Sequence, residues 1–174
     1  KGNARLNLTL EGDNTLLGLD HGAGIEVEKG ATLVITENST GSLRAVGGAY
    51  GAAGIGGNAG STDSEGANYG TGTIRIKGGT ISADGGAYWV PQTRDYEGGA
   101  GIGTGRYGIG GIIEILGGTI TAEGGKQTGA GIGGGMSGRV DTIVIGGTIG
   151  KAPDITVSSY KDSTKGYMGA AIGS

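Results

Sequence analysis

A short phrase, Gly-Ala-Gly-Ile or a close variant, occurs five times in this 174-residue chain and limits its fold more than any other feature. The copies end at Ile25, Ile55, Ile102, Ile132 and Ile172, which gives spacings of 30, 47, 30 and 40 residues. Self-similarity at this period indicates stacked structural units, each of which contacts only its neighbours and shares a core with them. The repeat therefore predicts a solenoid, with the differences in spacing absorbed by loops.

A second phrase alternates with the first and has the pattern of two short strands joined by a corner. Two aliphatic residues stand two positions apart, and Gly-Gly, Thr and a further aliphatic residue follow. Clear copies begin at Ile74, Ile113 and Ile143, and degenerate copies at Leu6 and Leu33. Side chains two positions apart on a strand share a face, so the pattern predicts strands with one buried face. A second strand is expected after each corner, from Thr80, Thr119 and Thr148, and Ala-Gly-Ile is expected to form a third.

The composition fits an all-β solenoid and excludes several other classes of protein. The chain has 45 Gly, and each Gly inside a helix costs roughly 0.5–1 kcal/mol relative to Ala, which excludes a helical bundle. Collagen needs abundant Pro, and there are two. No apolar run approaches the roughly 20 residues of a membrane span, and we expect no membrane insertion. The net charge of −3 argues against a nucleic-acid partner, and the absence of Cys excludes disulfides and thiolate metal sites.

We therefore predict an all-β fold, a right-handed parallel β-helix of about five coils with three strands each. Gly belongs at the corners, where the chain turns sharply and no side chain fits. The coils are expected at residues 3–30, 31–70, 71–108, 109–138 and 139–174, in a single domain. Because the chain starts at Lys1 and has no signal peptide, we expect it to be a segment of a longer protein. On neighbouring first strands, Arg75 and Glu114 are expected to form an outward ladder pair of opposite charge.

Most aromatic residues fall in the loops between the second and third strands, which should lie above one another along one edge. These are Tyr50, Tyr88, Trp89, Tyr96, Tyr160 and Tyr167. Flat aromatic faces stack on the C–H faces of sugar rings while nearby polar groups bind the hydroxyls, and Arg94 is the expected polar clamp. The same rings could instead anchor a protein partner, since Tyr, Trp and Arg are enriched at interface hot spots, or fold back over their own loops.

The whole chain resembles a known class of bacterial repeat region. The residues that carry the resemblance are the run from Leu8 to Leu16, the Gly-Ala-Gly-Ile phrase and the run from Lys29 to Thr36. They are similar to the Gly-Ala-Gly-Ile-Gly-Gly repeat regions of secreted or wall-anchored bacterial surface proteins and, more distantly, to β-helical carbohydrate-binding modules. The resemblance implies an extracellular or cell-wall location, a polysaccharide or glycan partner, and calcium as an open question.

The leading hypothesis is accordingly a non-catalytic module that binds polysaccharide through the aromatic loops. The alternative is a structural stalk or adhesin segment that presents a protein-binding surface. A polysaccharide lyase or hydrolase is a remote third reading, because such enzymes need clustered carboxylates. The acids of this chain are scattered, and only Asp84 and Glu123 are expected to stack, as weak candidates for a cation site. His21, next to Asp20, is the one His and has no nucleophile placed beside it.

Overall fold

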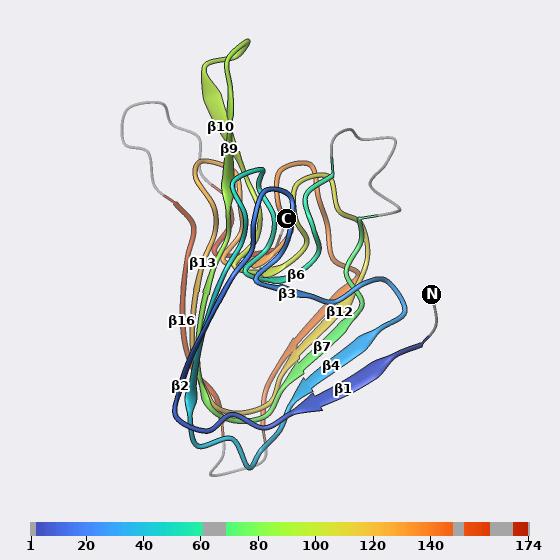
Figure 1. Ribbon diagram of the computed structural model, residues 1–174, viewed down its shortest axis with the longest axis vertical. Helices are drawn as coiled ribbons and strands as arrows, with labels where there is room; N and C mark the ends of the chain where they lie inside the picture. The colour runs from blue at the N-terminus through green and yellow to red at the C-terminus, as the bar shows by residue number, and fades with distance from the viewer. Residues whose placement is uncertain (1–2, 61–68, 148–151, 161–168, 174) are drawn as a thin grey trace.

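The computed structural model describes residues 3–60, 69–147, 152–160 and 169–173, and all regular secondary structure in these ranges is β-strand. None of the described residues belongs to a helix that could cross a membrane. The chain builds three parallel sheets of five strands each, and each sheet takes one strand from every repeat unit (Figure 1). This arrangement is consistent with a parallel β-helix or solenoid, as the repeat predicts.

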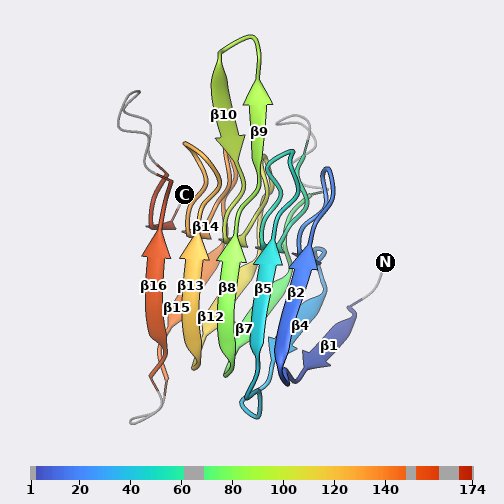
Figure 2. The same ribbon diagram turned by 60° about the vertical axis from the view of Figure 1, so that its left-hand side comes forward.

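The three sheets have matching strand orders. The first sheet contains β1 (Arg5–Leu8), β4 (Thr32–Ile35), β7 (Thr73–Ile76), β12 (Ile112–Ile115) and β15 (Thr142–Ile145). The second contains β2 (Asp13–Leu17), β5 (Ser42–Val46), β8 (Thr80–Asp84), β13 (Thr119–Glu123) and β16 (Asp154–Ser158). The third contains β3 (Ile25–Glu26), β6 (Ile55–Gly56), β11 (Ile102–Gly103), β14 (Ile132–Gly133) and β17 (Ile172–Gly173). Figure 2 shows the second sheet as adjacent arrows that point the same way.

The aliphatic residues of the period-2 pattern form the core, as predicted. In the first sheet Ile74 is in register with Ile113, and Ile76 with Ile115. All four side chains are fully buried, and Ile81 and Ile120 continue the core into the second sheet. Because each unit places the same residue type in the same column, one continuous aliphatic core runs along the stack.

Glycine is required in the third sheet because successive units approach each other too closely for a side chain. A Cβ atom on Gly103 would lie 1.9 Å from the carbonyl oxygen of Gly133, and one on Gly56 would lie 1.8 Å from that of Gly103. Both residues also have positive φ angles, 141° and 138°. The strands here comprise Ile-Gly (Ile-Glu in β3) and not the predicted Ala-Gly-Ile. The Gly before each Ile is also closely packed: a Cβ atom on Gly101 would lie 2.7 Å from the Ala83 carbonyl oxygen of the second sheet.

The outward faces of the sheets carry ladders of opposite charge. Arg75 donates a hydrogen bond from Nε to Glu114, its register neighbour, which confirms the predicted pair. This hydrogen bond, together with the charge of Glu114, raises the pKa of the Arg75 guanidinium above its ordinary value. In the second sheet Arg44 forms an ion pair with Asp84 at 2.8 Å. These exposed contacts are worth less than about 1 kcal/mol each and mainly keep the strands in register.

The second strand of the last unit was predicted to begin at Thr148, and that prediction is wrong. The strand is β16, and Asp154, not Thr148, stands in register with Thr119. The residues Asp154 to Ser158 alternate polar and apolar side chains, which lets Ile155 and Val157 face the core beside Ile120 and Ala122. The alternation of polar and apolar residues therefore sets the register of β16, and the position of the Gly-Gly-Thr phrase does not.

Candidate functional site

The loop that carries most of the predicted site, residues 85–98, is not irregular. It contains an antiparallel hairpin formed by β9 (Ala87–Val90) and β10 (Asp95–Gly98), inserted between β8 and β11. Figures 1 and 2 show this hairpin standing beyond the ends of the sheet strands. Arg94 closes its turn with a φ angle of 57°, and its N–H donates to the Val90 carbonyl at 2.9 Å. The predicted polar clamp is thus an exposed residue of the turn.

The hairpin separates the predicted aromatic residues onto two faces. Trp89 is directly opposite Tyr96, and Tyr88 is directly opposite Glu97 one position along. Consecutive side chains on a strand point to opposite faces, so Trp89 and Tyr96 share one face while Tyr88 shares the other with Glu97. The sequence placed these residues in one loop but could not assign them to faces without the register.

The first face presents a row of three side chains that we call the platform: Trp89, Tyr96 and Lys126. The ring centroids of Trp89 and Tyr96 are 4.9 Å apart with an interplanar angle of 57°, a tilted aromatic contact. Lys126, from the loop after β13, holds its Nζ atom 4.6 Å from the Tyr96 centroid. Trp89 remains 44 % exposed, which is unusual for so large an apolar side chain. Lys126 was not among the predicted site residues, and only its place in the neighbouring loop pointed to it.

The second face of the hairpin is packed against the body of the protein by an ion pair. Arg106 Nη1 donates to Glu97 Oε2 at 2.5 Å, and the two side chains are 7 % and 17 % exposed. The Arg106 guanidinium also lies 4.5 Å from the centroid of Tyr88 and donates from Nε to the Gly60 carbonyl. The prediction missed Arg106, whose position directly after a Gly-rich phrase resembles that of an ordinary surface residue.

Tyr88 continues a column of stacked rings that runs across three units. Tyr50 stacks on His21 at a centroid distance of 4.2 Å and on Tyr88 at 5.1 Å. The three residues come from successive units, so Tyr50 lies between its two partners and both faces of its ring are covered. The predicted stacking of these loops along one edge is confirmed for these three residues. The contacts account for Tyr50 and Tyr88 as packing residues, and the structure does not bring them to the platform.

The edge of β10 is fixed to the fourth unit by three hydrogen bonds. The Tyr96 N–H donates to Gln127 Oε1 at 2.5 Å, and the Gly98 N–H donates to Thr128 Oγ1 at 2.8 Å. The Gly98 carbonyl accepts from the Met136 N–H at 2.7 Å. Gln127 is almost completely buried, so the packing around it restricts its side chain. The hairpin is therefore held rigidly at its base although its tip projects.

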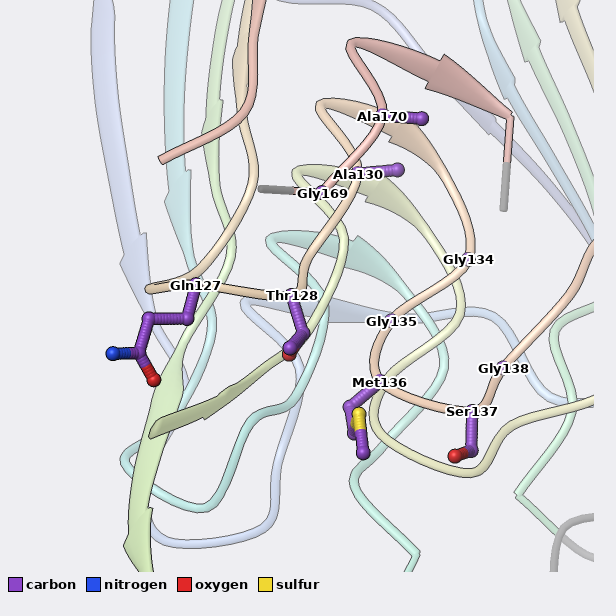
Figure 3. Close-up of a pocket in the computed structure, with 10 residues that line it drawn as sticks. All are labelled: Gln127, Thr128, Ala130, Gly134, Gly135, Met136, Ser137, Gly138, Gly169 and Ala170. Carbon is purple, nitrogen blue, oxygen red and sulfur yellow. The ribbon is translucent and has the colours of Figure 1, made fainter. Parts of the chain in front are cut away.

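Two grooves meet where Gln127, Thr128 and Met136 bind the edge of β10. One, of about 340 Å³, is lined by Thr93, Asp95, Tyr96, Glu97, Gln127, Thr128 and Met136. The other, of about 590 Å³, shares Gln127, Thr128 and Met136 with it and continues toward Ala170. Figure 3 shows the second groove, in which Ala130 and Ala170 of successive units point the same way, with Met136 and Ser137 on the loop below them. Together the grooves bring polar residues next to the platform, of which Glu97, Gln127 and Thr128 already take part in the contacts described above.

The two candidates for a cation site are register neighbours, as expected: Asp84 on β8 and Glu123 on β13. Asp84, however, already forms an ion pair with Arg44. Across the described ranges no group of three or more His, Cys, Asp or Glu side chains is arranged to hold a metal ion.

The remaining predicted aromatic residues lie in the last unit. Tyr160 follows β16 by two residues and is half-buried. Tyr167 lies outside the described residues.

Comparison with protein-family models, with curated proteins and with solved structures finds no match to this chain. The geometry of the site is thus the basis for any functional conclusion.

Proposed function

We propose that the protein is a non-catalytic carbohydrate-binding module and that the platform is its binding site. The observation that carries the proposal is the exposed ring of Trp89, held against Tyr96 on a hairpin whose base is fixed on one face by the Glu97–Arg106 ion pair and along the edge of β10 by hydrogen bonds. A large ring that is rigid before binding loses little conformational entropy when a ligand stacks on it. A sugar ring is a ligand of this kind, because its apolar C–H face can stack on the aromatic ring while the hydroxyls on its rim remain free to form hydrogen bonds.

The grooves beside the platform support a ligand with hydroxyls on its rim. Thr93, Asp95 and Thr128 line the smaller groove, and the Lys126 ammonium lies over the Tyr96 ring. These groups donate or accept hydrogen bonds in a mixed polar and apolar environment, as in sites that orient small polar ligands. A groove of about 340 Å³ lies within the usual range for a small-ligand site, about 300–1,000 Å³.

The test is calorimetric titration of the wild-type chain and three variants with plant, mucin and bacterial-wall polysaccharides, with and without calcium. Trp89→Ala and Tyr96→Ala are expected to weaken binding at least about tenfold, the loss of roughly 1.4 kcal/mol from one stacking contact. Ile112→Ala is the matched control, because Ile112 is an exposed apolar residue on β12 in the first sheet and no platform residue. A wild-type chain that binds no glycan, or a Trp89→Ala variant that binds as the wild type does, would contradict the proposal and favour the stalk or adhesin reading.

We also infer that the three sheets close into a right-handed parallel β-helix of five coils. The support is the register, which pairs every strand of the three sheets with its equivalent in the neighbouring unit, and the strong right-handed preference of parallel crossover connections, about 98 %. The resemblance of the repeat phrase to bacterial surface proteins supports an extracellular or wall-attached setting. In such a setting the hairpin would present the platform beyond the body of the stack.

A further inference from the structure

Lys126 is the charged member of the platform, and contacts restrict both its backbone and its ammonium group. Its carbonyl accepts a hydrogen bond from the Thr128 N–H at 3.0 Å, and the next two residues, Gln127 and Thr128, bind the edge of β10. Its Nζ atom lies 4.6 Å from the centroid of the Tyr96 ring. A side chain that is already restricted loses less conformational entropy when a ligand binds it. The ammonium group is thus placed one aromatic ring away from the exposed Trp89.

The protein does not neutralise this ammonium group. Among the described residues Lys126 forms no ion pair, and its side chain is exposed. The contact with Tyr96 is an attraction to the electron-rich face of the ring and leaves the positive charge in place. The N–H donors of the ammonium group are therefore available to a negatively charged ligand.

The acidic residues of the hairpin belong to its other face. Asp95 and Glu97 alternate with Tyr96 along β10, so they share the face of Tyr88. There Glu97 is paired with Arg106. The strand residues that alternation assigns to the platform face are uncharged: Ala87, Trp89, Tyr96 and Gly98. Asp95 also borders the smaller groove, so an anionic group is favoured at the platform and not in that groove.

The charge of the whole chain makes this local cation more informative. The net charge is −3 at pH 7, so the chain as a whole repels an anionic polymer. Charges in solvent are screened beyond about 8–10 Å at moderate salt, and attraction for an anion must come from a positive group close to it. The platform joins such a group to an exposed aromatic ring.

We propose that the ligand of the platform is an acidic polysaccharide, whose sugars carry carboxylate or sulfate groups. The C–H face of one sugar stacks on Trp89, and an anionic group of that sugar or of its neighbour in the polymer binds the Lys126 ammonium. The inference rests on the proposed carbohydrate binding and adds the charge of the ligand. Lys accepts either anion, because its ammonium group is a compact charge without the planar geometry of a guanidinium.

Calorimetric titration with matched pairs of polymers tests the proposal. The first pair is polygalacturonate and the same polymer after its carboxyl groups have been reduced to alcohols. The second pair is dextran sulfate and dextran, which distinguishes sulfate from carboxylate. Calcium is chelated, so that no ion bridges polymer and protein. The wild-type chain is expected to bind the anionic member of at least one pair about fivefold more tightly than the neutral member, with a difference that shrinks as salt is added.

Three variants show whether Lys126 causes this preference. Lys126→Gln is expected to weaken binding of the anionic polymer about fivefold, the effect of losing one exposed ion pair, and to leave binding of the neutral polymer unchanged. Lys126→Arg keeps the charge and is expected to keep the preference. Lys29→Gln is the matched control, because Lys29 is exposed at the corner between β3 and β4 and its loss changes the net charge equally.

The outcomes separate this inference from the function on which it rests. Lys126→Gln binding that falls equally for the anionic and the neutral polymer would mean that Lys126 only supports Tyr96, and it overturns the inference. A wild-type chain that binds neutral glycans as tightly as anionic ones, or more tightly, also overturns it, while carbohydrate binding stands. A wild-type chain that binds no glycan of either kind overturns both.

Discussion

Gly103 shows why so many residues of this chain are glycine. Its φ angle of 141° is one that residues with a Cβ atom rarely adopt, and that atom would overlap the Gly133 carbonyl oxygen. The same overlap recurs between Gly56 and Gly103 and between Gly133 and Gly173. The repeated Gly is therefore a condition for stacking units at the spacing of hydrogen-bonded strands, and not a sign of disorder.

Replacing Gly103 with Ala should destabilise the protein strongly. The strained backbone alone is worth about 1–3 kcal/mol, and the overlap with the next unit adds to it. Gly146→Ala is the control, because a Cβ atom there would meet nothing within 4 Å. Urea unfolding followed by circular dichroism compares the two. Equal stability of the two variants would mean that the units are not packed as closely as described.

Glu97 and Arg106 form the buried ion pair of the hairpin. Glu97→Gln removes one charge and leaves Arg106 buried without its counter-ion, which we expect to cost about 3 kcal/mol of the free energy of unfolding. The matched substitution Glu114→Gln acts on an ion pair of the outward ladder and should cost less than about 1 kcal/mol. Thermal unfolding of both variants checks the difference. A neutral Glu97→Gln variant would show that the pair does not hold the hairpin.

Within the part of the chain that the structure describes, the hairpin is the regular element that interrupts the repeat, and its flanks indicate that it is an insertion. A Cβ atom on Gly125 would lie 1.9 Å from the Gly86 carbonyl oxygen, and one on Gly129 would lie 2.1 Å from that of Gly99. The backbone before and after the hairpin thus stacks on the fourth unit, where only Lys126, Gln127 and Thr128 join the same two points.

Replacing residues 87–98 with the sequence Lys-Gln-Thr should therefore leave the stack folded and remove the platform. The far-ultraviolet circular dichroism spectrum is expected to keep its β-sheet form, and glycan binding is expected to be lost. Loss of the folded state would show instead that the hairpin and its ion pair are needed for the stack. Retention of glycan binding would place the binding site elsewhere.

The sequence was informative about the hairpin's residues but not about its form. Tyr88, Trp89 and Tyr96 were placed in one loop along the aromatic edge, and the repeat predicted that the loops carrying His21, Tyr50 and Tyr88 lie above one another, but not that these three rings stack. The division into two faces depends on the register between β9 and β10, which a one-residue shift would reverse. No local pattern in residues 85–98 determines that register.

For the whole molecule, the repeat was sufficient to predict three stacked sheets with an aliphatic core. Identical residues in identical columns leave little choice of register in the middle units, where Ile74, Ile113 and their neighbours pair as expected. Prediction was wrong in the last unit, where the clear copy of the phrase at Ile143 is not followed directly by the strand that its Gly-Gly-Thr predicts. The buried partners Arg106 and Gln127 could not be predicted, because their roles depend on contacts between loops of different units.

Carbohydrate binding at the platform can be followed through the fluorescence of the single tryptophan. Trp89 belongs to the platform, so its emission reports on that site alone. Titration of the folded wild-type chain with the same polysaccharides is expected to give a saturable spectral shift with one glycan class and reduced quenching by acrylamide. An unchanged spectrum with every glycan, from a sample shown to be folded, would contradict the account.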